Sequence, residues 1–191
     1  MAPRLRPKRI LVFGDSIVEG VGAEAAKGRN GDLIANAGAK TWVVALAERM
    51  DAEYSSVGYG RQGFTVRGNG NVPPFAASGV EADEDCSWDK LWAGRPRFAS
   101  GATSGAASGA EAEQGTRPQL DLVLIMHGTC DGLIAGESAS SAVRIATAAL
   151  LPRLRAALGP QPKLFLCVPF GGVRRPQTAT SPRAASGHAA V

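Results

Sequence analysis

The sequence predicts an α/β fold in which helices cover both faces of a parallel sheet. Short apolar runs at residues 10–13, 120–126 and 163–168 stop at glycine, proline or a polar motif, as strands buried on both faces do. Residues 40–50 and 143–154 instead repeat apolar side chains at helical spacing. The chain has 191 residues, of which 45% are hydrophobic, and this suits a single domain with a substantial core.

The first strand, over residues 10–13, ends at Gly14-Asp15-Ser16. Ser16 therefore follows the carboxyl end of a strand, and in open α/β sheets that edge borders the crevice where ligands bind. Two interpretations are open at this point. Either Asp15 or Ser16 caps a helix that follows, or the Ser16 hydroxyl is placed for chemistry.

A strand–helix–strand unit comes next. Residues 19–38 predict a loop, residues 40–50 an amphipathic helix and residues 54–57 a second strand. The crossover of such a unit is right-handed. The glycine-rich stretch 57–70 then forms either a backbone that bends tightly against another group or a plain flexible loop. Its glycine spacing does not match a dinucleotide-binding fingerprint.

Residues 71–116 predict a long excursion from the sheet, in which Trp88 and Phe98 can pack as a lid. Within it, residues 99–116 are mainly alanine, serine, glycine and threonine. Because these side chains bury too little apolar surface to order a segment, we expect a mobile, low-complexity insertion there.

The third strand, over residues 120–126, is followed by Gly128-Thr129-Cys130-Asp131. Ser138 or Ser140 can cap the next helix. Pro152 predicts a kink or a break in that helix, because proline removes a backbone hydrogen bond. Residues 163–168 form the fourth predicted strand.

Both ends of the chain are expected to lie outside the domain, which covers residues 10–173. The net charge of +4 is carried by basic side chains near the start, so residues 1–9 predict a solvated basic tail. Residues 174–191 lack apolar periodicity and predict a disordered tail.

The composition argues against several classes of protein. The basic residues are not interleaved with aromatic side chains as in nucleic-acid modules. No apolar stretch has the length of a membrane span or the pattern of a signal peptide, so we expect a cytoplasmic protein. The odd set of Cys86, Cys130 and Cys167 argues against a disulfide framework and against a zinc site.

Three predicted strand ends carry short motifs: Gly14-Asp15-Ser16, Gly60 to Thr65, and Gly128 to Asp131. In this order they resemble the SGNH or GDSL hydrolases, over about residues 10–172. The resemblance implies a flavodoxin-like, three-layer α/β/α sandwich, here without the family's last strand and helix. The run after residue 57 is most similar to the carbohydrate esterases among these hydrolases.

The resemblance also implies a serine ester hydrolase that acts through an acyl-serine intermediate. Ser16 matches the nucleophile, and its N–H matches one donor of the oxyanion hole. Gly63 matches the second donor. Cys130 stands where the family's Gly-x-Asn-Asp motif places an asparagine, the third donor. The implied substrate is a small ester or an acylated sugar, with no metal and no organic cofactor, and the oligomeric state is left open.

Two departures from the family pattern affect the predicted activity. A thiol at Cys130 is a weak hydrogen-bond donor compared with an amide. The family's Asp-x-x-His motif has no match, because Ala185 stands three residues before His188, which is expected to be a tail residue. His127 is expected to line the pocket or to be structural, although it is also a candidate base. The alternative function is therefore a catalytically degenerate SGNH-fold protein that binds carbohydrate or a protein partner.

Overall fold

The computed structural model describes residues 5–24, 36–76, 86–92, 95–98 and 119–167. The predicted insertion at residues 99–116 and the predicted tail at residues 174–191 lie outside these ranges. Of the predicted basic tail, residues 5–9 are described. None of the helices within the described ranges has the length and hydrophobicity that a bilayer crossing requires.

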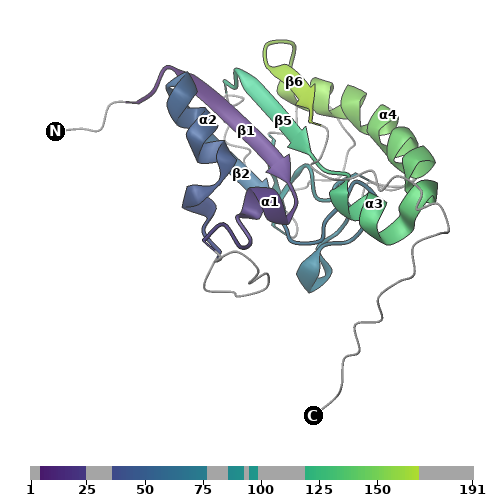
Figure 1. The fold of residues 1–191 in the computed structure, drawn as a ribbon. Helices are drawn as coiled ribbons and strands as arrows, with labels where there is room; N and C mark the ends of the chain where they lie inside the picture. The colour runs from purple at the N-terminus through teal and green to yellow at the C-terminus, as the bar shows by residue number, and fades with distance from the viewer. Residues whose placement is uncertain (1–4, 25–35, 77–85, 93–94, 99–118, 168–191) are drawn as a thin grey trace.

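The central sheet has four strands, and all of their pairings are parallel. Their order is β2-β1-β5-β6, and Figure 1 shows the arrows of β1 and β5 side by side and pointing the same way. The strands are β1 (Lys8–Gly14), β2 (Ala52–Gly58), β5 (Leu122–Met126) and β6 (Lys163–Leu166). This confirms the predicted parallel sheet with flavodoxin-like strand order. β1 begins two residues before the predicted strand, because Lys8 and Arg9 pair with β2.

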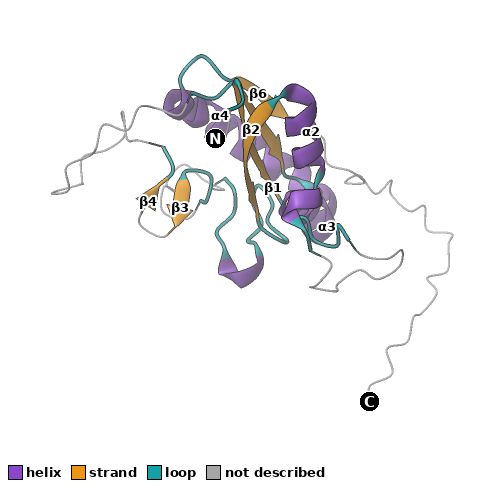
Figure 2. Ribbon diagram, turned by 90° about the vertical axis from the view of Figure 1, so that its left-hand side faces the viewer, coloured by secondary structure: helices purple, strands orange, loops and turns teal. Residues whose placement is uncertain are grey.

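Two longer helices cover the sheet from opposite sides (Figure 2). They are α2 (Trp42–Met50) and α4 (Ala139–Leu158), close to the predicted ranges. Short elements complete the described chain: α1 (Ser16–Glu19), η2 (Gly38–Lys40), η3 (Asn69–Asn71), the antiparallel pair β3 (Lys90–Trp92) and β4 (Arg95–Pro96), α3 (Thr129–Ala135) and η4 (Gly136–Ser138). The helices on both faces give the three predicted layers.

Alternate side chains of the buried strands enter two separate hydrophobic clusters. On β1, Leu11 and Phe13 pack in the cluster that contains the apolar face of α4, whereas Ile10 and Val12 pack in the cluster that contains Val43 of α2. This alternation is what a strand with a helix layer on each side requires. It explains why residues 10–13 of β1 and all of β5 are apolar at every position.

Of the predicted kink or break at Pro152, the break does not occur. Helix α4 runs through Pro152, because Leu150 and Leu154 are both buried and hold the helix to the sheet on either side of the proline. Trp88 and Phe98 do not form a separate lid. Their rings stack with centroids 5.9 Å apart, and both side chains are buried in the α4-side cluster.

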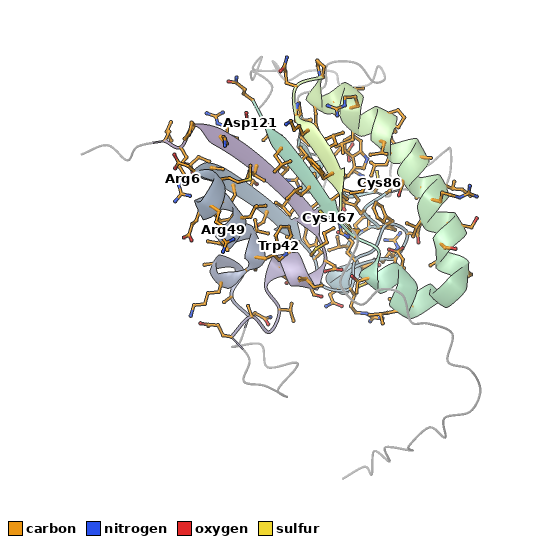
Figure 3. All side chains as sticks on the ribbon, turned by 45° about the horizontal axis from the view of Figure 1, so that its top comes forward. Arg6, Trp42, Arg49, Cys86, Asp121 and Cys167 are labelled. Carbon is orange, nitrogen blue, oxygen red and sulfur yellow. The ribbon has the colours of Figure 1, made fainter. Side chains whose placement is uncertain are left out.

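Figure 3 marks the edge of the sheet where the strands begin. Arg6 and Asp121 lie there, away from the ends toward which the arrows point. The backbone N–H of Arg6 donates to Glu53 Oε1 at 3.0 Å, and that of Arg9 donates to Asp121 Oδ2 at 2.8 Å. These bonds tie the start of β1 to its neighbours, so the described part of the basic segment is not a free tail.

Candidate active site

The three motifs follow strands that end at the same level of the sheet. Gly14 of β1 is the register partner of Gly58 in β2 and of Met126 in β5. From β1 the chain passes to β2 on one side of it, and later returns to form β5 on its other side. The direction of the strand order therefore reverses between β1 and β5. This is the position at which open α/β sheets bind ligands. Ser16 and the Gly128–Asp131 motif border it.

Asp15, and not Ser16, caps the helix at this position. Asp15 Oδ1 accepts a hydrogen bond of 2.9 Å from the N–H of Ile17, and Ser16 is the first residue of α1. Burial raises the pKa of the Asp15 carboxyl, against the effect of the Ile17 N–H. Within the described residues, no side chain or backbone group hydrogen-bonds the Ser16 hydroxyl. The hydroxyl is therefore not needed as a cap.

The helix that begins with Ser16 is pressed against the end of β2. A Cβ atom on Gly58 would lie 2.4 Å from the backbone nitrogen of Glu19 and 3.0 Å from the carbonyl oxygen of Asp15. Both contacts are to backbone, which cannot swing away. Glycine at this position therefore lets α1 lie directly on the strand and fixes the place of Ser16.

The glycine-rich stretch is a tightly folded loop. The N–H of Tyr59 donates to the Gly14 carbonyl at 3.3 Å, and the N–H of Gln62 donates to the Tyr59 carbonyl at 3.1 Å. The buried Gln62 side chain donates to the Pro73 carbonyl at 2.6 Å. The N–H of Gly63, the predicted oxyanion donor, donates to the Val66 carbonyl at 3.0 Å. Of the two interpretations, the structure supports the tight bend.

Asp131 joins this loop to α3. Its carboxylate accepts hydrogen bonds from the N–H of Phe64 at 2.7 Å, the N–H of Thr65 at 2.8 Å and the hydroxyl of Thr65 at 2.7 Å. The side chain is 1% exposed. A Cβ atom on Gly63 would lie 2.2 Å from Asp131 Oδ2, so only glycine leaves room for the carboxylate.

Cys130 precedes Asp131 and is buried. Burial, aided by the negative charges of Asp15 and Asp131, raises the pKa of its thiol to about 11, while the positive charge of Arg61 acts in the opposite direction. The thiol is therefore protonated at neutral pH. Direct contacts join the motifs, because Tyr59 of the loop donates to the Gly14 carbonyl and Phe64 donates to the Asp131 carboxylate.

His127 lies in the core beside this site. Its ring stacks on Phe75 with centroids 4.4 Å apart, and its Nδ1 is 3.4 Å from the Gln62 carbonyl oxygen. Burial lowers the pKa of the imidazole to about 4. The ring is therefore neutral at pH 7 and is held by its aromatic neighbours.

When the chain is compared with known proteins, its matches are solved structures. No protein-family model and no curated protein matches the chain. A family two carbohydrate esterase from Clostridium thermocellum, in complex with cellohexaose, matches with a TM-score of 0.59 and 18% identity over 88% of this chain and 45% of that one. The chain has the SGNH hydrolase fold of these esterases. The predicted fold class is thus confirmed.

Other structures with this SGNH fold give the same result. A carbohydrate esterase family 2 enzyme plus carbohydrate binding domain from Corynascus thermopiles (Myceliophthora fergusii) matches with a TM-score of 0.58 and 18% identity, over 87% of this chain and 46% of that one. A family two carbohydrate esterase from Cellvibrio japonicus matches with a TM-score of 0.54 and 20% identity, over 86% and 43%. The chain therefore spans less than half the length of these three esterases.

Within this SGNH fold, the candidate base is not found beside Ser16 among the described residues. His188 lies outside them, and the described bonds of His127 are to other groups. The described residues also contain no cluster of three or more potential metal ligands. Sequence reasoning identified the residues that border the carboxyl edge of the sheet. It missed the hydrogen bonds by which Asp131 clamps Phe64 and Thr65 of the loop, and it missed the position of Arg61.

The neutral state of His127 predicts a loss of stability in acid. Because the folded pKa is about 4 and the ordinary value is 6.5, the unfolded chain binds more protons between these values, and stability falls as the pH drops through that window. We expect His127 to account for a loss of about 3 kcal/mol by pH 4. Urea unfolding at pH 7 and pH 4.5 measures it.

A His127→Phe variant is the control for this effect, because phenylalanine suits a site beside Phe64 and Phe75. The variant should lose clearly less stability than the wild type between the two pH values. Equal losses would show that His127 is not buried in its neutral form.

Proposed function

We propose that this domain is an SGNH-type serine ester hydrolase that acts on small or carbohydrate O-acyl esters through an acyl-Ser16 intermediate. One observation carries the proposal. β2, β1 and β5 end at one register level, so Ser16, the loop at residues 59–65 and the motif at residues 128–131 border the switch point of the sheet. A serine hydroxyl without a capping role lies at that point.

In the proposed reaction, Ser16 Oγ attacks the acyl carbon and its hydroxyl proton passes to solvent water, which returns a proton to the departing alcohol. The carbonyl oxygen becomes negative in the tetrahedral intermediate, and hydrogen-bond donors must meet it there. The intermediate then expels the alcohol, and water releases the acid from Ser16. The candidate donors are the N–H groups of Ser16 and Gly63 and the thiol of Cys130, so two of the three are backbone groups.

We expect this hydrolysis to be slow. The Gly63 N–H must leave the Val66 carbonyl before it can serve the oxyanion, and a neutral thiol at Cys130 donates weakly. Without a base beside Ser16, a site of this type keeps a rate on the order of a thousand-fold over water, from binding and the oxyanion hole alone.

An acetylated sugar is the proposed substrate class. Solved structures of the same fold include an acetyl xylan esterase from Butyrivibrio proteoclasticus, with a TM-score of 0.52 and 17% identity. Another is a carbohydrate esterase complex that holds cellohexaose. The proposal requires no metal and no organic cofactor, because serine, water and hydrogen-bond donors suffice for ester cleavage.

The proposal is tested with p-nitrophenyl acetate and a fluorophosphonate probe. The wild type should hydrolyse the ester above the buffer rate and become labelled at Ser16. Ser16→Ala should lose both properties while keeping its thermal unfolding midpoint. Ser55→Ala, a change on the exposed side of β2, should keep both. A wild type that neither turns over the ester nor takes up the probe would refute the hydrolase.

A second candidate function is carbohydrate binding without catalysis. It is favoured by the neutral, buried His127 and the thiol at Cys130, which leave the described site without an evident base or a strong third donor. One matching structure, with a TM-score of 0.55, carries a title that names divergent catalytic and non-catalytic binding functions of a carbohydrate esterase's active site. Calorimetric binding of cellohexaose that is unchanged by Ser16→Ala, together with no ester turnover, would support this function over hydrolysis.

A further inference from the structure

Arg61 is a cation that the described residues leave without a partner, in the loop beside the candidate site. It lies in the turn that the hydrogen bond from Gln62 to Tyr59 closes, and it is exposed to solvent. No hydrogen bond or ion pair to its guanidinium is found among the described residues. The turn itself is held to the end of β1 by the bond from Tyr59 to the Gly14 carbonyl.

The backbone of Arg61 adopts a conformation that glycine prefers. Its φ is +63°, a region that non-glycine residues rarely enter because the Cβ atom is crowded there. Glycine occurs at positions 58, 60 and 63 of the same loop, so it would fit the turn with less strain. Strained residues of this kind cluster at functional sites, where the side chain has a use.

The charge of Arg61 reaches the position of the missing donor. It acts on the thiol of Cys130, against the effects of burial and of Asp15 and Asp131. The backbone places Arg61 between two contacts to the other motifs. Tyr59 donates to the Gly14 carbonyl at the end of β1, and Gly63 lies so close to the Asp131 carboxylate that a Cβ atom on it would be 2.2 Å from Oδ2. Asp131 follows Cys130, which stands in place of the asparagine of related motifs. A guanidinium carries several N–H donors, and its hydrogen bonds to anionic oxygen are stronger than those of a neutral group.

We propose that the guanidinium of Arg61 donates hydrogen bonds to the oxyanion of the tetrahedral intermediate and so supplies the donor that Cys130 lacks. The inference rests on the proposed hydrolase. It makes Arg61 a catalytic residue whose interaction forms in the transition state, when the oxygen gains its charge.

Arg61→Gly tests the role with little risk to the fold, because glycine accepts the positive φ and should leave the unfolding midpoint unchanged or higher. For p-nitrophenyl acetate we expect kcat to fall about 10- to 100-fold with KM within a factor of about two. Fluorophosphonate labelling of Ser16 should slow in parallel, since the phosphoryl oxygen occupies the same position. Arg61→Lys should recover part of the rate.

Asn71→Gly is the matched control. Asn71 is exposed in the same loop and also has a positive φ, of +61°, so this change relieves the same kind of strain and adds the same flexibility. It should leave kcat and the labelling rate unchanged. An unchanged kcat in Arg61→Gly, a change in KM alone, or an equal loss in Asn71→Gly would overturn the inference while the hydrolase stands. A wild type without Ser16-dependent turnover overturns both.

Discussion

Replacing Asp131 by alanine is expected to destabilise the folded protein by about 3–5 kcal/mol. The carboxylate accepts three hydrogen bonds at 2.7–2.8 Å from Phe64 and Thr65. Without it, the Phe64 N–H is left unpaired in a buried place and the two Thr65 donors in a partly buried one, at about 1–3 kcal/mol for each buried group. Since small domains are stable by only about 5–15 kcal/mol, the variant should unfold at a much lower urea concentration. Tryptophan fluorescence and circular dichroism follow the unfolding.

Two variants separate this clamp from a general effect of removing a carboxylate. Asp121→Ala removes an exposed acceptor that holds a single N–H, that of Arg9, and should have an effect of about 1 kcal/mol or less. Asp131→Asn keeps one carbonyl oxygen but presents an NH2 group to the remaining donors, so it should lie between wild type and alanine. An Asp131→Ala variant as stable as Asp121→Ala would mean that the loop does not depend on the clamp.

The clamp also shows where sequence reasoning stops. β1, β5 and β6 could be predicted from their apolar runs, because a strand with a helix layer on each face is apolar at successive positions. The shared edge of Ser16 and the two later motifs followed from the parallel direction of those strands. In contrast, Asp131 bonds to residues more than sixty positions earlier, and no local pattern encodes such a contact.

Other departures have the same cause, which is tertiary packing that outweighs a local preference. Pro152 is tolerated within α4 because buried leucines on both sides anchor the helix. Trp88 and Phe98 are buried in the core because an apolar cluster is available to them. The positive φ of Arg61 could not be predicted, since glycines fill the positions around it and suggest only a flexible turn.

Cys130→Asn is expected to raise kcat of the proposed hydrolase by about 10²–10³-fold in an Arg61→Gly background, and by less where Arg61 already serves the oxyanion. An amide N–H replaces a thiol that burial keeps protonated and that donates weakly. Removal of a good oxyanion donor from an enzyme raises the barrier by about 2.7–4 kcal/mol, and supplying one should lower the barrier by a similar amount. KM should change little, because the donor meets full negative charge only in the transition state. Steady-state kinetics with p-nitrophenyl acetate measures both constants.

Cys130→Ala tells whether the thiol itself contributes. It should match the wild-type kcat within a few-fold, because little is lost when a weak donor is removed.

Combining Cys130→Asn with Arg61→Gly then asks whether the two side chains serve one oxygen. If they do, the loss caused by Arg61→Gly should shrink once asparagine is present, because the oxyanion already has its third donor. In the Arg61→Gly background, an asparagine variant with unchanged, Ser16-dependent turnover would place Cys130 outside the oxyanion hole.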